Sequence, residues 1–219
     1  MTAKTVSIPW SDDQSVTGRL VGGVLSPGIL LAHGAGTNQD HASIVRLRDG
    51  IAAAGYPVLT FNYPYTELGS RRPDPQQRLL ACHRAVVEWF CGNVAQTVVG
   101  AGRSMGGRMA TYLAAEGMPF AGLILFAYPL HPAGKPDRLR KDHLADVSCP
   151  MLFIVGTRDP LSTMPLFDQW IRPLAQSTVV EIEDGDHSFR VRKSSGRTNE
   201  EAQAQAVTAA VDWLRSLDG

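Results

Sequence analysis

One serine in this chain stands in a setting that would make it a nucleophile. The segment Gly102–Gly106 reads Gly-Arg-Ser-Met-Gly, and it lies between an apolar run and a stretch with helical periodicity, Gly107–Glu116. A Gly-x-Ser-x-Gly segment between a strand and a helix is typical of a nucleophile elbow, a sharp turn that exposes the serine. Glycine suits both outer positions because the backbone is crowded there. The pattern predicts that Ser104 is a nucleophile for acyl transfer.

An acid and a base that would activate Ser104 follow it in the chain. Asp159 comes shortly after the apolar run Met151–Val155, and His187 lies in the loop Glu183–Phe189. A histidine can take the serine proton, while a carboxylate orients the imidazole and stabilises its charged form. The chain order Ser, Asp, His is the one expected when each residue follows a strand of an α/β sheet. We therefore predict Ser104, Asp159 and His187 as the catalytic residues.

Two neighbouring carboxylates compete with Asp159 for the role of the acid. Asp184 and Asp186 lie so close to His187 in sequence that they are less favoured, but either would raise the pKa of its imidazole or cap a helix. Asp159 precedes a proline, and an Asp-Pro pair also favours an ordinary turn.

The turn His33-Gly34-Ala35-Gly36, after the apolar run Gly28–Ala32, is expected to complete an oxyanion hole. We assign the two backbone N–H donors to Ala35 and Met105. Two roles stay open for His33: hydrogen bonds that hold the turn in place, or contact with a substrate.

Other basic residues are candidates for substrate contact. Arg103 is next to the predicted nucleophile, and His131 lies in a long loop expected to overhang the site. Arg71 and Arg72, in a loop on the same side of the sheet, would favour anionic substrates. Each arginine has a simpler alternative as a solvated surface residue or a member of an ion pair.

Three further histidines are assigned structural positions. His83 falls on the apolar face of a helix and is expected in the core, whereas His41 and His143 are expected at the surface.

Apolar runs alternate with amphipathic stretches along the chain. Strands are expected at Thr5–Ile8, Val16–Val24, Gly28–Ala32, Val58–Phe61, Thr97–Ala101, Gly122–Phe126, Met151–Val155 and Thr178–Ile182. Helices are expected at about His41–Ala54, with Asn38 or Asp40 as the N-cap, at 79–90, and at Gly107–Glu116, Met164–Ala175 and Glu200–Leu217. Loops are expected at Pro64–Pro75 and at Tyr128–Pro150, which has room for one helical turn. This alternation predicts an α/β fold, a mostly parallel twisted sheet with helices on both faces, in a single domain over residues 1–219. The loop 128–150 is long for a loop but too short for a lid domain, so it leaves room for only a minimal lid.

Composition narrows the function classes. The chain has 219 residues, and its 21 Lys+Arg balance its 21 Asp+Glu, which argues against a nucleic-acid-binding surface. It has no apolar run long enough to span a membrane and no signal-peptide pattern at its start, so we expect a soluble, cytoplasmic protein. Its three cysteines lack metal-ligand spacing, and we expect neither a metal nor an organic cofactor. The oligomeric state is left open.

With these motifs in order, the chain resembles the α/β-hydrolase superfamily over nearly its whole length, and more closely a small branch akin to the dienelactone hydrolases. Within that branch, the segments Gly102–Arg108 and Tyr128–Pro132 resemble a predicted-hydrolase group. That group includes the testis-expressed hydrolase-like proteins and a subunit of the NSL histone-acetyltransferase complex. The resemblance implies hydrolysis through a covalent acyl-enzyme. Dienelactone hydrolases carry a cysteine at the elbow, where this chain has Ser104.

The favoured hypothesis is a serine carboxylesterase that acts on small, soluble, short-acyl esters. A scaffold or binding protein that keeps the fold without turnover is the alternative from another class. A peptidase, a thioesterase or a perhydrolase would use the same triad, because fold and triad alone do not select the acyl substrate.

Overall fold

The fold is described here from a computed structural model, which describes residues 2–217. Within them, eight strands form one sheet in the order β1-β2-β4-β3-β5-β6-β7-β8. The strands are β1 (Lys4–Ser11), β2 (Gln14–Val21), β3 (Gly28–Ala32), β4 (Val58–Phe61), β5 (Val98–Arg103), β6 (Gly122–Phe126), β7 (Met151–Gly156) and β8 (Ser177–Ile182). Strands β3 to β8 run parallel, β2 is antiparallel to β4, and β1 is antiparallel to β2. The predicted mostly parallel sheet is confirmed.

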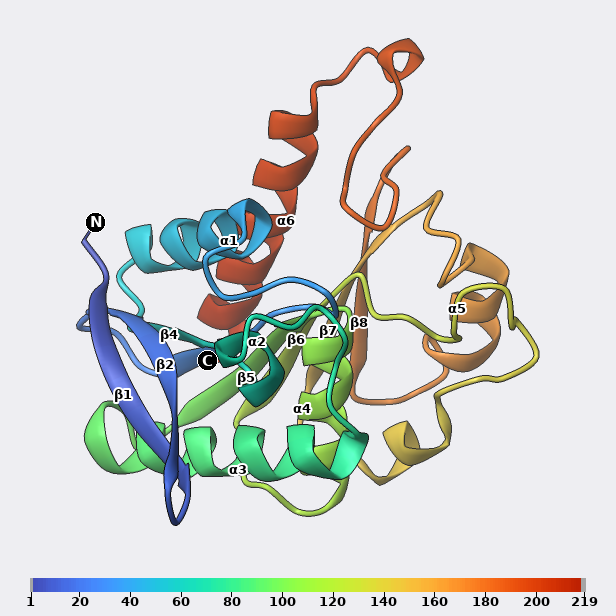
Figure 1. The fold of residues 1–219 in the computed structure, drawn as a ribbon. Helices are drawn as coiled ribbons and strands as arrows, with labels where there is room; N and C mark the ends of the chain where they lie inside the picture. The colour runs from blue at the N-terminus through green and yellow to red at the C-terminus, as the bar shows by residue number, and fades with distance from the viewer. Residues whose placement is uncertain (1, 218–219) are drawn as a thin grey trace.

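Helices cover both faces of this sheet (Figure 1). They are α1 (Ala42–Ala53), α2 (Pro64–Glu67), α3 (Gln76–Asn93), α4 (Met105–Ala115), α5 (Met164–Trp170) and α6 (Asn199–Ser216), with short 3₁₀ turns η1 (Asp142–Asp146) and η2 (Lys193–Ser195). Helices α1 and α6 lie on one face, and α3 and α4 lie on the other (Figure 1). Within residues 2–217, no helix is both long enough and apolar enough to cross a membrane.

The central strands are continuous apolar runs because both of their faces are buried. In β3, the side chain of Leu30 packs in the apolar layer beneath α3 and α4, whereas Ile29 and Leu31 pack beneath α1 and α6. Successive side chains of a strand point to opposite faces, so one short run supplies both layers.

Three local predictions were wrong. The predicted loop 64–75 contains the one-turn helix α2, which starts with Pro64, a residue whose restricted φ suits the first helical position. Helix α5 ends at Trp170 and not at Ala175, because Pro173 disfavours helical backbone at the residue before it. Helix α1 is capped by His41, whose ring accepts a hydrogen bond from the backbone N–H of Ser43, and not by Asn38 or Asp40.

Strand β5 and helix α4 approach each other very closely at the turn between them. A Cβ atom added at Gly102 would lie 2.2 Å from the backbone nitrogen of Gly107, and one added at Gly106 would lie 2.4 Å from the carbonyl oxygen of Ala32. Any side chain at these positions would push the helix away from the sheet. The two outer glycines of the motif are therefore required by backbone packing.

We expect Gly102→Ala to lower the free energy of unfolding by about 1–3 kcal/mol, because the added methyl group overlaps backbone atoms that cannot move aside separately. Urea denaturation measures the change. The control is Gly92→Ala in α3, where no atom of the described residues beyond the adjoining residues and the backbone of that helix lies within 4 Å of the new Cβ. The control should leave stability unchanged or raise it slightly, and equal losses in the two variants would contradict the packing argument.

Candidate active site

Ser104 occupies a strained turn between β5 and α4. Its backbone has φ 52° and ψ −112°, a left-handed conformation that costs a non-glycine residue about 1–3 kcal/mol. Its N–H donates to the carbonyl oxygen of Phe126 at the end of β6, over 2.9 Å. The turn therefore holds the serine at the carboxyl edge of the parallel strands, where open α/β sheets form their sites.

The three residues predicted to act together do meet at this edge. The Nε2 atom of His187 lies 3.0 Å from the Oγ atom of Ser104, and its Nδ1 atom lies 2.7 Å from Oδ2 of Asp159. Ser104 follows β5, Asp159 follows β7 and His187 follows β8. The sheet order places these three strand ends along one edge.

The surroundings of Asp159 determine which imidazole nitrogen carries the proton. The residue is 1% exposed, and the second carboxylate oxygen, Oδ1, accepts the backbone N–H of Leu161 at 2.9 Å. An ionised carboxylate can only accept hydrogen bonds, so Nδ1 of His187 must donate to it. Nε2 is then the acceptor for the hydroxyl of Ser104. This arrangement can move the serine proton to the imidazole while holding the resulting cation beside a carboxylate.

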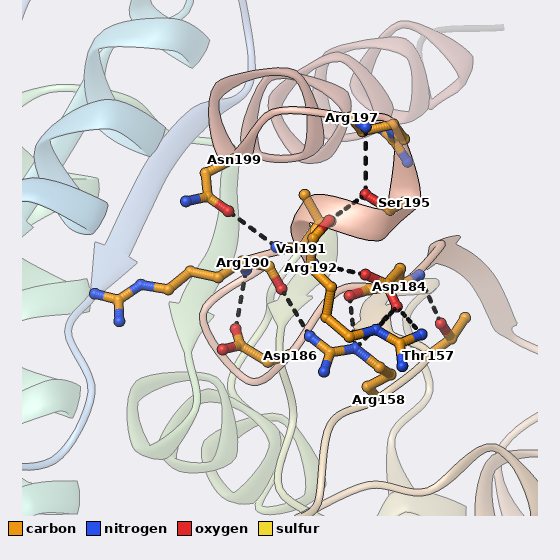
Figure 2. A network of polar contacts seen from close by, with 10 residues as sticks. All are labelled: Thr157, Arg158, Asp184, Asp186, Arg190, Val191, Arg192, Ser195, Arg197 and Asn199. Atoms are coloured by element: carbon orange, nitrogen blue, oxygen red, sulfur yellow. Dashed lines mark hydrogen bonds and ion pairs between the residues drawn. The ribbon is translucent and has the colours of Figure 1, made fainter.

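Asp184, the first rival acid, is bound to arginines (Figure 2). Its Oδ1 accepts from Nε of Arg192 at 2.7 Å and lies 3.1 Å from Nε of Arg158. Its Oδ2 accepts the backbone N–H of Arg192 at 2.7 Å. These hydrogen bonds from Arg192, and the positive charges, hold the pKa of Asp184 below its ordinary value. Its carboxylate thus ties together the two loops that carry Asp159 and His187.

Asp186, the second rival, stabilises a turn within its own loop. Its Oδ1 atom accepts the backbone N–H groups of Ser188 at 2.7 Å and Arg190 at 2.9 Å. Within the described residues, Asp159 is the carboxylate that contacts the imidazole of His187.

Arg103 forms hydrogen bonds to the histidine loop, the loop Glu183–Phe189 that carries His187. Its guanidinium Nη2 donates to the carbonyl oxygen of His187 at 2.8 Å and to Oγ of Ser188 at 2.9 Å, and the residue is only 9% exposed. It is absent from the described residues that line the cleft around Ser104. Burial lowers the pKa of this guanidinium. These contacts are those of a residue that positions His187. The sequence had suggested substrate contact for Arg103.

His33 is fully buried and uses both ring nitrogens. Nδ1 lies 2.8 Å from the carbonyl oxygen of Gly34, and Nε2 accepts the backbone N–H of Tyr63 at 3.2 Å. Burial lowers the pKa of the ring to about 4, so it is neutral at physiological pH and its Nδ1–H donates. These contacts hold the turn in place, the first of the two roles considered for His33.

The two proposed oxyanion donors lie beside Ser104. Ala35 and Met105 line the same cleft as the serine. Within residues 2–217, neither backbone N–H donates a hydrogen bond, and Met105 is the first residue of α4, where no acceptor exists inside the helix. Both N–H groups are available to a ligand.

The cleft around Ser104 has a volume of about 310 Å³. His131, predicted from its loop, is part of the lining, and its Nδ1 lies 2.9 Å from the carbonyl oxygen of Pro132. Arg108 and Arg140, which were not among the residues predicted from the sequence, also line the cleft. Arg108 follows Ser104 by four residues, about one helical turn. That spacing could have indicated that its side chain lies near the serine.

Two histidines outside the site match their predicted places, and one does not. His83 is buried, with Nδ1 3.0 Å from the hydroxyl of Tyr63, and His41 is exposed. His143 was predicted at the surface but is partly buried: its ring stacks on Tyr112 with centroids 3.9 Å apart, and Nε2 lies 2.9 Å from Oγ1 of Thr111. Burial lowers its pKa to about 4. Both contacts come from α4, which lies far from His143 in the sequence, so the local sequence could not predict them.

Among residues 2–217, no group of three or more His, Cys, Asp or Glu side chains is placed to hold a metal ion.

Comparison with known families and structures identifies relatives of this architecture. The sequence profile of a family described as an alpha/beta hydrolase domain matches residues 26–215. A dienelactone hydrolase from Anabaena variabilis superimposes with a TM-score of 0.78 at 20% identity, covering 98% of this chain and 97% of that one.

Two other solved structures are similar to this chain. An alpha-beta serine hydrolase homologue from Coxiella burnetii has a TM-score of 0.74 and 17% identity, with 95% of this chain and 97% of that chain covered. A protein from Xanthomonas campestris, described as an a/b serine hydrolase without a lid, has a TM-score of 0.72 and 18% identity, with coverages of 97% and 95%. At these identities the likeness concerns the fold.

Asp184→Asn should destabilise the protein at neutral pH and lose its effect in acid. The folded pKa of Asp184 is lowered, so its stabilising effect is present above its ordinary pKa of 3.8 and disappears as the pH falls through the folded value. Urea unfolding of wild type and variant, from neutral pH to below 3.8, measures this. Asp212→Asn, at an exposed ion pair, is the control with little expected change. A stability difference independent of pH would contradict the assignment.

Proposed function

The chain belongs to the alpha/beta hydrolase domain family, and we propose that it is a serine hydrolase that cleaves small carboxylic esters through a covalent acyl-enzyme. The observation that carries this proposal is the continuous pair of hydrogen bonds from Ser104 through His187 to Asp159. A serine in a strained turn, a buried carboxylate and an imidazole between them together form the arrangement that activates a hydroxyl.

Acylation begins with the hydroxyl of Ser104. Its oxygen attacks the ester carbonyl carbon while Nε2 of His187 takes its proton, and Asp159 stabilises the imidazolium that forms. The carbonyl oxygen becomes an oxyanion, which the free N–H groups of Ala35 and Met105 stabilise. The tetrahedral intermediate then collapses, and the alcohol leaves with the proton from His187.

Deacylation repeats these steps with water. His187 takes a proton from a water molecule, the hydroxide attacks the acyl carbon, and Ser104 leaves with the proton that the imidazole returns. The 24% exposure of the His187 side chain supports this role, because water must reach its Nε2 side.

The cleft supports small substrates. Its volume is about 310 Å³, at the low end of small-molecule pockets, and the segment between β6 and β7 contributes one short turn, η1, in place of a lid domain. Short-acyl, water-soluble esters fit this shape better than long lipids. A serine in place of the dienelactone hydrolases' cysteine also supports general ester hydrolysis. The cytoplasmic location, the single domain over 1–219 and the kinship with the testis-expressed and NSL-subunit group stay predictions.

A fluorophosphonate probe should label the wild-type protein at Ser104, since the activated hydroxyl displaces fluoride from phosphorus and forms a stable phosphonate ester. Ser104→Ala should abolish labelling, and Ser70→Ala, at an exposed serine, should not. Mass spectrometry of the labelled peptide identifies the site. A folded wild type that stays unlabelled, or a Ser104→Ala protein that still labels, would overturn the proposal.

We expect Asp159→Asn to lower kcat for a short ester by about 10³-fold or more, because the amide favours the wrong imidazole tautomer. Asp186→Asn is the matched control: its Oδ1 can still accept the two backbone N–H groups, so activity should stay near that of the wild type. Circular dichroism confirms folding of both variants. Near-normal activity of Asp159→Asn would return the role of the acid to Asp184 or Asp186.

A further inference from the structure

Two arginines share the cleft with Ser104. Arg108 projects from α4, one turn after the serine, and its backbone N–H donates to the carbonyl oxygen of Ser104 at 3.1 Å. Arg140 comes from the loop between β6 and β7. Neither belongs to the proton-transfer machinery described above.

These two guanidinium groups lack the carboxylate partners that several other arginines have. Arg158, Arg172 and Arg192 are paired with carboxylates, whereas within residues 2–217 the side chains of Arg108 and Arg140 have neither an ion pair nor a hydrogen bond. The Nε atom of Arg108 is buried without a hydrogen-bond partner. A buried donor without an acceptor is costly, and native proteins avoid it unless a ligand or water supplies the acceptor.

The two positive charges also act on each other. Burial lowers the pKa of Arg140, and repulsion by Arg108 lowers it further. Like charges held together without a counter-ion favour the entry of an anion, because the anion relieves the repulsion and satisfies the donors.

The other charged groups around the cleft do not cancel this field. Asp74 is the carboxylate among the described lining residues, and its Oδ2 lies 3.8 Å from Nε of Arg78. Asp142 and Asp146 act on His143, and both are exposed. The Asp74–Arg78 pair is neutral as a unit, so the cleft keeps the positive charge of Arg108 and Arg140.

We propose that Arg108 and Arg140 bind a carboxylate of the substrate, so that the enzyme acts on esters that also carry a free carboxylate group. This inference rests on the proposed hydrolase function and specifies its substrate class. The planar guanidinium forms paired, charge-assisted hydrogen bonds with a carboxylate, which also orient it. Because Arg108 lies one helical turn from Ser104, only a few substrate atoms would separate the carboxylate from the scissile ester bond.

Matched ester pairs test the proposal on both sides of the scissile bond. The acyl-side pair is monomethyl adipate and methyl hexanoate, and the alcohol-side pair is para-carboxyphenyl acetate and its methyl ester. In one pair, kcat/KM should be about 10- to 100-fold higher for the carboxylate ester, chiefly through a lower KM. The pair that shows the preference tells which product carries the carboxylate.

Substitution should remove this preference. Arg108→Gln and Arg140→Gln should each lower kcat/KM for the carboxylate ester more than for its neutral partner. Arg138→Gln, at an exposed arginine two residues before Arg140, should leave the ratio unchanged. Arg140 lies on a loop, so its variant tests the proposal even when substitution in α4 impairs folding. No preference in either pair, or equal losses for both esters, would overturn the anion site and leave the hydrolase proposal standing.

Binding without turnover separates the two proposals. Adipate should raise the melting temperature of Ser104→Ala, and it should do so less in Ser104→Ala combined with Arg140→Gln. If the wild type neither labels with fluorophosphonate nor cleaves any ester, the hydrolase proposal fails, while this adipate effect would still support the anion site. The anion-site proposal would be overturned if adipate raised the melting temperature of Ser104→Ala equally with and without Arg140→Gln, or raised it in neither protein.

Discussion

The close backbone contact between the end of β5 and the start of α4 is the constraint on which the rest of the site depends. Atoms of Gly102, Gly106 and the end of β3 approach so closely that no Cβ fits between them. This packing forces the residue in the middle of the turn, Ser104, into a left-handed conformation. The strain persists because the sheet and helix around it are fully packed, and it directs the hydroxyl out of the core.

The partners of Ser104 come from loops that polar contacts hold in place. A Cβ at Gly156 would lie 2.3 Å from the carbonyl oxygen of Gly185, so the acid loop and the histidine loop are in direct backbone contact. Asp184 joins the same two loops through its arginines, and Arg103 holds the carbonyl oxygen of His187. Together these contacts hold the imidazole of His187 between Ser104 and Asp159, so that little further ordering of the loops is needed for the three side chains to act together.

Charge is distributed unevenly around the nucleophile. On the side of His187, the carboxylates of Asp159, Asp184 and Asp186 are all used by hydrogen-bond donors. On the cleft side, Arg108 and Arg140 keep donors without acceptors among residues 2–217. The carboxylates on the first side have their hydrogen-bond donors within the protein, whereas the two arginines on the second side are the groups for which we propose an anionic ligand. In the proposed reaction, the first side would serve proton transfer and the second would select the substrate.

The sequence by itself determined the succession of strands and helices along the chain and the position of the glycine-flanked turn. These features depend on local backbone preference and on burial of the central strands on both faces. It therefore predicted the sheet and brought forward Ser104, Asp159 and His187. Only the tertiary structure decided which side chains face one another: Asp184 toward arginines, Arg103 toward the histidine loop and Arg108 toward the cleft. The physical reason is that these contacts join segments far apart in the chain, and their geometry follows from sheet order and loop direction, which no local pattern encodes.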